Sequence, residues 1–161
     1  MMRKVFAALA TLLMLAVVLQ FLLAGSGAFD TAARVEAFQP HRALGYGILL
    51  FAVLLTLIAA LARLPGRLIG MTGLVAGLVL VQGVIRAIAS ASSETGDNTS
   101  TVGELIFGLH AVNGLIIMAV VGMILRQARA LSSSQAPLRR SGVAEHAGAS
   151  GPAADPAHPA S

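Results

Sequence analysis

The stretch Phe107-Gly108-Leu109-His110-Ala111-Val112-Asn113-Gly114 decides how the chain is interpreted, because it places an ionisable side chain and an amide inside an apolar segment. The surrounding run, from Leu105 to Leu125, is close to the roughly 20 residues that a helix needs to cross the hydrocarbon core of a bilayer. A polar side chain at that depth needs a hydrogen-bonding partner. The other apolar runs must therefore supply partners for His110.

Composition supports a membrane protein. Hydrophobic residues make up 57% of the chain and charged residues 11%, whereas soluble domains contain about 25% charged residues. The apolar runs lack the polar face that helices of a soluble bundle carry. The sequence therefore predicts an all-α fold, with residues 1–130 forming a bundle of four transmembrane helices at about 5–24, 43–62, 68–88 and 103–125.

The two ends of the chain differ in character. Residues 131–161 are rich in Ala, Ser, Gly and Pro, so we expect a disordered cytoplasmic tail that buries too little surface to fold. The first apolar run follows Arg3 and Lys4, as a signal peptide would. Its apolar core exceeds the usual ~7–15 residues, which favours an uncleaved first helix.

The distribution of Lys and Arg predicts the orientation. One side of the membrane carries eight of these residues and the other side three, namely Arg34, Arg42 and Arg86. The side with the excess is expected to be cytoplasmic, so both termini are placed there. Arginine greatly outnumbers lysine, a bias typical of GC-rich bacterial genomes, and we expect a multi-pass protein of the bacterial inner (plasma) membrane.

Several function classes are excluded or lack support. The chain has no cysteine, which removes disulfides, thiol catalysis and cysteine-bound metals. Its basic residues lie at helix ends and form no single patch, so nucleic acid is not an expected partner. No phosphate-binding loop, HExxH motif or Ser/His/Asp set is present. We therefore assign no catalytic residues and expect a protein without enzymatic activity.

Helical spacing places both candidate histidines on faces of small residues, which is typical of a face packed on protein. His110 shares its face with Asn113 and Gly114, and His41 lies in line with Gly45. Both are expected to point inward. Gln20 lies near the outer end of the first helix.

The third helix carries two opposite faces of interest. Gln82 and Arg86 share one face, and a glycine stripe occupies the other. Because one helix cannot direct both faces inward, either Arg86 snorkels or pairs with Glu104, or the stripe contacts a second copy of the chain. The homodimer would use Gly66, Gly70, Gly73 and Gly77.

The sharpest hypothesis is a b-type haem, or a quinone-like ligand, held between His41 and His110 in the outer half of the membrane. Neutral imidazole is a usual axial ligand of haem iron. Arg42 or Arg86 would pair with the propionates, and Asn113 would contact the ligand. A straight-helix estimate opposes this arrangement, because it puts His41 roughly 10 Å above His110.

Two resemblances accompany these residues. Pro40-His41-Arg42-Ala43-Leu44-Gly45 and Leu109-His110-Ala111-Val112-Asn113-Gly114 resemble the paired histidine helices of small membrane b-type cytochromes and of haem A synthase. From Arg3 to about Arg129 the chain resembles a family of small bacterial four-helix membrane proteins of unknown function. The first resemblance implies haem binding, and the second implies the topology alone.

The alternative interpretation is structural. His41 then anchors its helix at the interface, and His110 bonds a neighbouring helix through Gln82, Asn113 or a backbone carbonyl. Buried polar contacts of this kind hold membrane bundles together at about 0.6–2 kcal/mol each. On this basis the leading expectation is a structural or partner-binding module in the lipid bilayer, and haem or quinone binding is the alternative.

Overall fold

The computed structural model describes residues 2–93 and 101–133, and the regular secondary structure in these ranges is α-helical. Four long helices and one short helix follow along the chain: α1 (Met2–Ala28), α2 (Arg34–Ala37), α3 (Gln39–Leu61), α4 (Gly66–Ser93) and α5 (Thr101–Ser133). Each long helix is long and apolar enough to cross a membrane. The predicted all-α bundle of four transmembrane helices is confirmed, and the chain is a multi-pass membrane protein.

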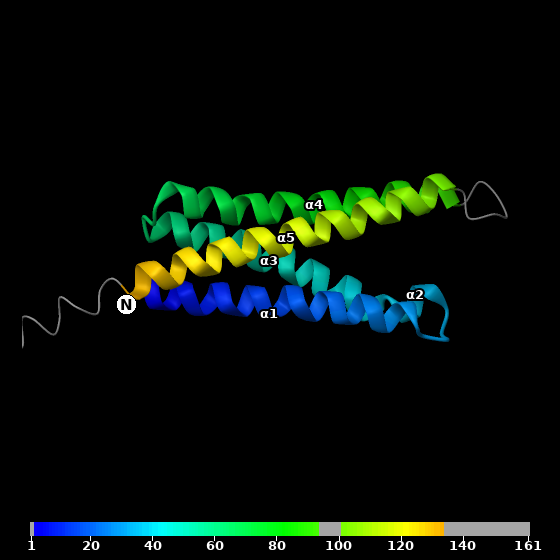
Figure 1. Ribbon diagram of the computed structural model, residues 1–161, viewed down its shortest axis with the longest axis horizontal. Helices are drawn as coiled ribbons and strands as arrows, with labels where there is room; N and C mark the ends of the chain where they lie inside the picture. The colour runs from blue at the N-terminus through cyan, green and yellow to red at the C-terminus, as the bar shows by residue number, and fades with distance from the viewer. Residues whose placement is uncertain (1, 94–100, 134–161) are drawn as a thin grey trace, which may run out of the picture.

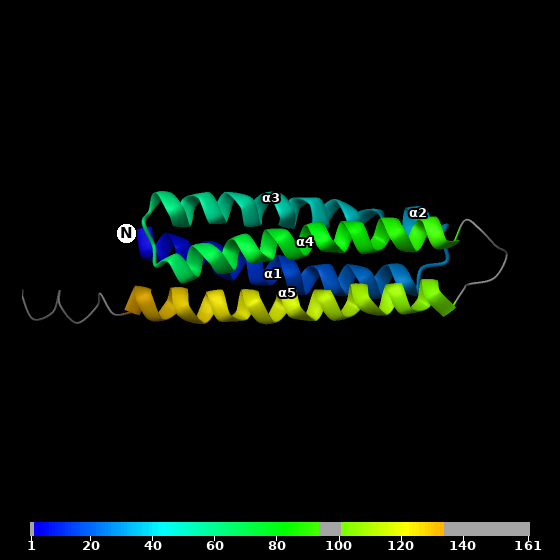
Figure 2. The same ribbon diagram turned by 90° about the horizontal axis from the view of Figure 1, so that it is seen from above.

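The four long helices form an antiparallel bundle (Figures 1 and 2). Contacts link α1 with α3, α3 with α4, α4 with α5 and α5 with α1, so α3 and α5 lie across the bundle axis from each other. One end, termed the α2 end, carries α2 and the start of α3 (Figure 1). The opposite end is termed the basic end for its residues Arg3, Lys4, Arg63, Arg67, Arg126 and Arg129.

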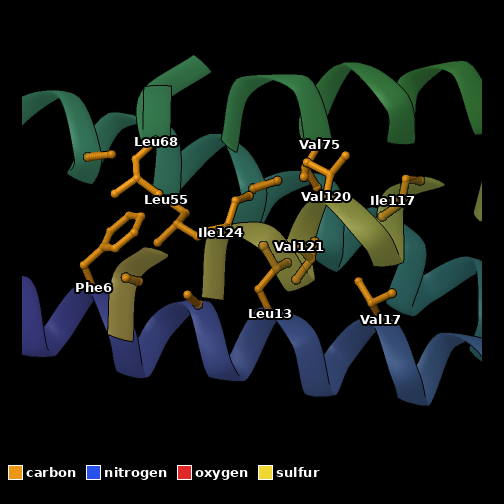
Figure 3. Close-up of a cluster of buried hydrophobic side chains, with 14 of the residues drawn as sticks. Phe6, Leu13, Val17, Leu55, Leu68, Val75, Ile117, Val120, Val121 and Ile124 are labelled. Atoms are coloured by element: carbon orange, nitrogen blue, oxygen red, sulfur yellow. The ribbon is translucent and has the colours of Figure 1, made fainter. Parts of the chain in front are cut away.

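One apolar cluster forms the core of the bundle (Figure 3). Leu13 of α1, Leu55 of α3 and Val121 of α5 are fully buried in it. Ala10 and Ala52 are also fully buried, and such small residues let helix backbones approach closely. Because lipid is as apolar as this core, the packing stabilises the bundle through close contact rather than through removal of apolar surface from water.

Large apolar side chains also cover the outside of the bundle. Leu15, Leu22, Leu50, Leu74 and Leu115 are each at least 50% exposed. The outer face of a soluble bundle would be polar at such positions. The exposed surface is therefore suited to contact with lipid chains, as the four apolar runs predict.

The α2 end is more helical than the gap between the predicted helices at about 5–24 and 43–62 implies. α1 continues through Ala28, α2 forms within the loop, and α3 already begins at Gln39. Pro40 lies in the first turn of α3, where its missing N–H costs no hydrogen bond. The predicted helices were too short at this end because helices continue beyond the apolar runs that reveal them.

The C-terminal end of α5 also continues beyond the apolar run that predicts it. The helix continues through Ser133, so residues 131–133, expected in the tail, are helical. The rest of the predicted tail, residues 134–161, lies outside the described residues.

α3 ends in a Schellman motif whose left-handed position is an arginine. Arg63 has a φ of 50°. Its N–H donates to the Ala60 carbonyl at 3.0 Å, and the Leu64 N–H donates to the Ala59 carbonyl at 3.0 Å. Glycine is the usual residue at this position, because a side chain in the left-handed conformation costs about 1–2 kcal/mol. The motif turns the chain directly into α4 and makes α3 and α4 antiparallel neighbours.

Candidate functional site: a polar layer with two facing histidines

Gln20 of α1 and His41 of α3 are joined by three polar contacts. The His41 Nδ1 lies 3.1 Å from the Gln20 backbone oxygen, and because a carbonyl only accepts, Nδ1 carries the proton. The Gln20 Nε2 donates to the His41 carbonyl at 2.8 Å and lies 3.3 Å from the His41 Nε2. In the neutral ring this Nε2 is therefore the acceptor. No local sequence pattern predicts this pair.

Gln82 of α4 and His110 of α5 make the corresponding contact on the opposite side of the axis. The Gln82 Nε2 donates to the His110 carbonyl at 3.0 Å. Close by, the Asn113 Nδ2 donates to the Leu78 carbonyl at 2.9 Å, and the Asn113 side chain is buried. Gln82 was expected to bond His110. The hydrogen bond is made to the backbone carbonyl of His110. The five residues Gln20, His41, Gln82, His110 and Asn113 are termed the polar layer.

The two halves of the polar layer repeat one arrangement. In each half a glutamine donates to the backbone carbonyl of a histidine on the following long helix, and a glycine follows that histidine by four residues. A Cβ on Gly45 would lie 3.2 Å from the Gln20 Nε2, and a Cβ on Gly114 would lie 3.4 Å from the Gln82 Nε2. Both glycines thus leave room for the amide. The pairs α1–α3 and α4–α5 are related by an approximate internal repeat.

The sequence carries a signal for this repeat that is easily missed. Each half reads as a glutamine followed by His-x-x-x-Gly. The separation between glutamine and histidine is 21 residues in the first half and 28 in the second. The unequal separations hide the repeat from a search at one fixed period.

The imidazole rings of His41 and His110 face each other across the bundle axis. Their centroids are 6.2 Å apart and their planes meet at 49°. The expected separation of roughly 10 Å in level is therefore wrong. That estimate assumed that α3 and α5 start at one level, whereas the first turns of α5 extend beyond the start of α3 (Figures 1 and 2).

Three buried atoms of the polar layer lack a hydrogen-bond partner among the described residues: Gln20 Oε1, Gln82 Oε1 and His110 Nδ1. The two amide oxygens are acceptors, and their assignment follows from the amide nitrogens, which donate to carbonyls. Leaving a buried polar atom unpaired costs about 1–3 kcal/mol. The layer therefore has unused polar capacity at the centre of the bundle.

Aromatic rings border the polar layer. Phe38, which precedes α3, packs edge-on against His41 with ring centroids 6.1 Å apart and planes at 90°. The Phe21 Cζ lies 3.2 Å from the place that a Cβ on Gly114 would take. Each half of the polar layer therefore has an aromatic ring beside it.

Arg42 and Arg86 lie toward the α2 end from the histidine rings. The Arg42 Nη2 donates to the Val35 carbonyl at 2.5 Å and thereby ties α3 to α2. Arg86, one turn beyond Gln82, is exposed, as snorkelling requires. Its alternative partner, the side chain of Glu104, lies outside the described part of the chain.

The glycine stripe of α4 is not uniform. A Cβ on Gly66, Gly70 or Gly77 would meet nothing within 4 Å. A Cβ on Gly73 would lie 3.8 Å from the Thr56 Cγ2 on α3. Three of the four glycines are thus open to the surroundings of the bundle, and the fourth faces a neighbouring helix.

A metal bound by protein side chains alone has few candidate ligands. In residues 2–93 and 101–133, no group of three or more His, Cys, Asp or Glu side chains could hold a metal ion. His41 and His110 form a set of two imidazoles. Two imidazoles suit a metal whose other positions are filled by a cofactor, as in haem.

The fold and the site together define a class: a multi-pass membrane protein whose four-helix bundle holds two facing histidines in a partly buried polar layer. Residues 20–89 match a family described as "Family of unknown function (DUF6220)". The match contains Gln20, His41 and Gln82 and ends before α5. No curated protein and no solved structure matches the chain. The predicted likeness to a family of unknown function is confirmed over these residues.

Proposed function

We propose that the polar layer binds a b-type haem with His41 and His110 as axial ligands, in a small membrane module without enzymatic activity. The observation that carries the proposal is the 6.2 Å separation of the two ring centroids. Two imidazoles that would hold one metal ion between them need ring centres farther apart than two metal–nitrogen bonds, which are about 2.0–2.1 Å each in zinc sites. The observed spacing is in the range for such a pair.

The position of the proton on the His41 ring supports the proposal. Its Nδ1–H donates to a backbone carbonyl, which is the partner that metal-binding histidines commonly have on their second nitrogen. The Nε2 lone pair is then the one available to iron. The Gln20 amide, 3.3 Å from that nitrogen, would have to turn away from it.

Small residues beside both histidines support the fit of a flat macrocycle. Gly45 and Gly114 carry no side chain, and the nearest atoms to their Cβ positions belong to the side chains of Gln20, Phe21 and Gln82. These atoms belong to side chains and not to a helix backbone. Arg42 and Arg86 would hold the propionates on the α2 side. When bound, haem supplies one-electron transfer.

A quinone fits the polar layer less well. The two carbonyl oxygens of a quinone accept hydrogen bonds. Two of the three unpaired atoms, Gln20 Oε1 and Gln82 Oε1, are also acceptors, so they offer a quinone no donor. Only the quinol, the reduced form with two O–H donors, would match these two oxygens.

The direct test is the visible spectrum of the protein purified from haem-replete cells, oxidised and reduced. A Soret band with reduced α and β bands is the expected result. A colourless and folded preparation would contradict haem binding and would leave a structural polar layer as the function.

The structural alternative is favoured by one observation, namely that hydrogen bonds of the layer join α1 to α3 and α4 to α5. Such interhelical bonds stabilise membrane proteins by about 0.6 kcal/mol on average and up to about 1.7 kcal/mol. In this interpretation the layer fixes helix register in a module that binds a protein partner.

Gln20→Leu separates the two functions. The substitution removes the Nε2 donor to the His41 carbonyl and leaves the Gln20 backbone carbonyl, which accepts from His41 Nδ1. We expect the free energy of unfolding in detergent to fall by about 0.6–1.7 kcal/mol, and the Soret absorbance per protein to remain.

Gln127→Leu is the matched control for this change. The Gln127 Nε2 donates to the Met71 sulfur at 3.6 Å, and sulfur is a weak acceptor. We expect a smaller loss of stability than for Gln20→Leu. Loss of the Soret band in Gln20→Leu alone would show that the amide, and not the His41 Nε2, holds the ligand.

The orientation belongs to the same proposal. We place the basic end in the cytoplasm and the α2 end outside, in the inner membrane of a bacterial cell. The support is the excess of Lys and Arg at the basic end, which the positive-inside tendency favours on the cytoplasmic side. The polar layer then lies in the outer half of the membrane.

A homodimer through α4 completes the proposal. Gly66, Gly70 and Gly77 leave their helix surface open, and small residues allow two helices to approach closely in lipid. Gly73 faces Thr56 and is not part of this surface. Gly70→Leu with Gly77→Leu should lower the dimer fraction in detergent crosslinking, whereas Gly108→Leu on α5, also open, should not. An unchanged crosslinked mass in the α4 variant would count against the interface.

A further inference from the structure

The charges of the described residues are segregated between the two ends of the bundle. The basic end carries six exposed cations, drawn from α1, the α3–α4 turn, α4 and α5: Arg3, Lys4, Arg63, Arg67, Arg126 and Arg129. The acidic side chains that the structure describes, Asp30 and Glu36, lie at the α2 end. The basic end therefore has a large positive charge without a nearby described carboxylate.

Helix dipoles do not create the positive potential at the basic end. Two helices, α1 and α4, begin at the basic end, and two, α3 and α5, end there (Figure 1). Their partial charges have opposite signs and largely cancel. The potential at this end comes from the side chains, so substitutions of single residues can change it.

Arg63 adds an independent observation. It occupies the left-handed position of the Schellman motif with a φ of 50°, where glycine would remove backbone strain. Its side chain is exposed, so no packing in the core accounts for an arginine there. Strain held at an exposed charged residue points to a role for the charge.

We infer that the basic end binds the headgroups of anionic phospholipids in the adjoining leaflet. Five of its six cations are arginines, and the planar guanidinium donates two parallel hydrogen bonds to a phosphate. Arg63 and Arg67 lie on either side of the Leu64–Pro65 step between α3 and α4. The inference is independent of the haem proposal, because the polar layer lies toward the other end.

Native mass spectrometry of the purified full chain tests the inference. The protein in neutral detergent is mixed with equal amounts of phosphatidylglycerol and phosphatidylcholine that have the same acyl chains. We expect phosphatidylglycerol to be the preferred lipid. Arg63→Gly with Arg67→Gln should reduce the preference roughly fivefold for each cation removed, and added salt should reduce it further.

Two further variants test the inference. Arg63→Gly alone should raise the unfolding temperature without lipid, because it relieves the strain, and should still lower the lipid preference. Arg34→Gln, which removes an exposed cation at the α2 end, should leave the preference unchanged. Equal binding of both lipids by the natural chain, or an equal loss in Arg34→Gln, would overturn the inference.

Discussion

Replacing His41 or His110 by alanine is expected to remove the Soret band of the purified protein and to lower haem occupancy at least ~10-fold. Loss of an outer-shell partner alone typically costs 10–100-fold in metal affinity, and the loss of an axial ligand costs more. The two rings approach from α3 and α5 across the bundle axis, 6.2 Å apart between centroids. Either substitution therefore leaves iron with one protein ligand.

Controls separate ligation from folding. His146→Ala, in the part of the chain outside the described residues, should keep the full Soret absorbance. His110→Gly creates room for free imidazole, so adding imidazole should restore the band if the ring itself is the ligand. Retention of the band in either alanine variant, with circular dichroism unchanged, would exclude haem held by both histidines.

The membrane class follows from the sequence because lipid restricts the possible structures strongly. A spanning segment must be about 20 apolar residues long and must satisfy its own backbone hydrogen bonds, so four apolar runs predict four helices. Helix faces were also predictable: the small residues beside His110 and Asn113 indicate a packed face, and Asn113 is buried.

The relative height of the helices was not predictable from hydropathy. Apolar runs show where lipid begins along one helix, but they do not show how far the helix continues beyond it. α5 begins at Thr101 and α3 at Gln39, and these starts lie at different levels (Figure 2). The stagger brings His41 and His110 together and accounts for the error in their expected separation.

Contacts between residues of different helices were still harder to predict from the sequence. The contact between Gln20 and His41 joins residues 21 apart in sequence, and no local pattern requires it. Gly73 likewise belongs to a regular stripe, but a Cβ there would contact Thr56 of the neighbouring helix. Such details depend on how two helix surfaces fit, which spacing along one helix does not contain.

The second large effect is expected at the α2 end. Gly27, in the last turn of α1, faces the backbone of α2: a Cβ there would lie 2.8 Å from the Ala37 carbonyl oxygen and 3.2 Å from the Phe38 Cδ1. A backbone atom cannot move aside alone, so Gly27→Ala must displace α2. We expect it to lower the free energy of unfolding by about 1–3 kcal/mol, as overpacking does.

The displacement should also reach the polar layer. Phe38 packs edge-on against His41 at 6.1 Å between centroids, so moving it changes the surroundings of a proposed axial ligand and should shift the Soret maximum. Gly25→Ala, two residues earlier in α1, is the matched control because its Cβ meets nothing within 4 Å. Alanine favours a helix over glycine by up to about 1 kcal/mol, so this variant should equal or exceed the natural chain in stability. If Gly27→Ala unfolded at the same detergent concentration as Gly25→Ala, the close packing of α1 on α2 would be refuted.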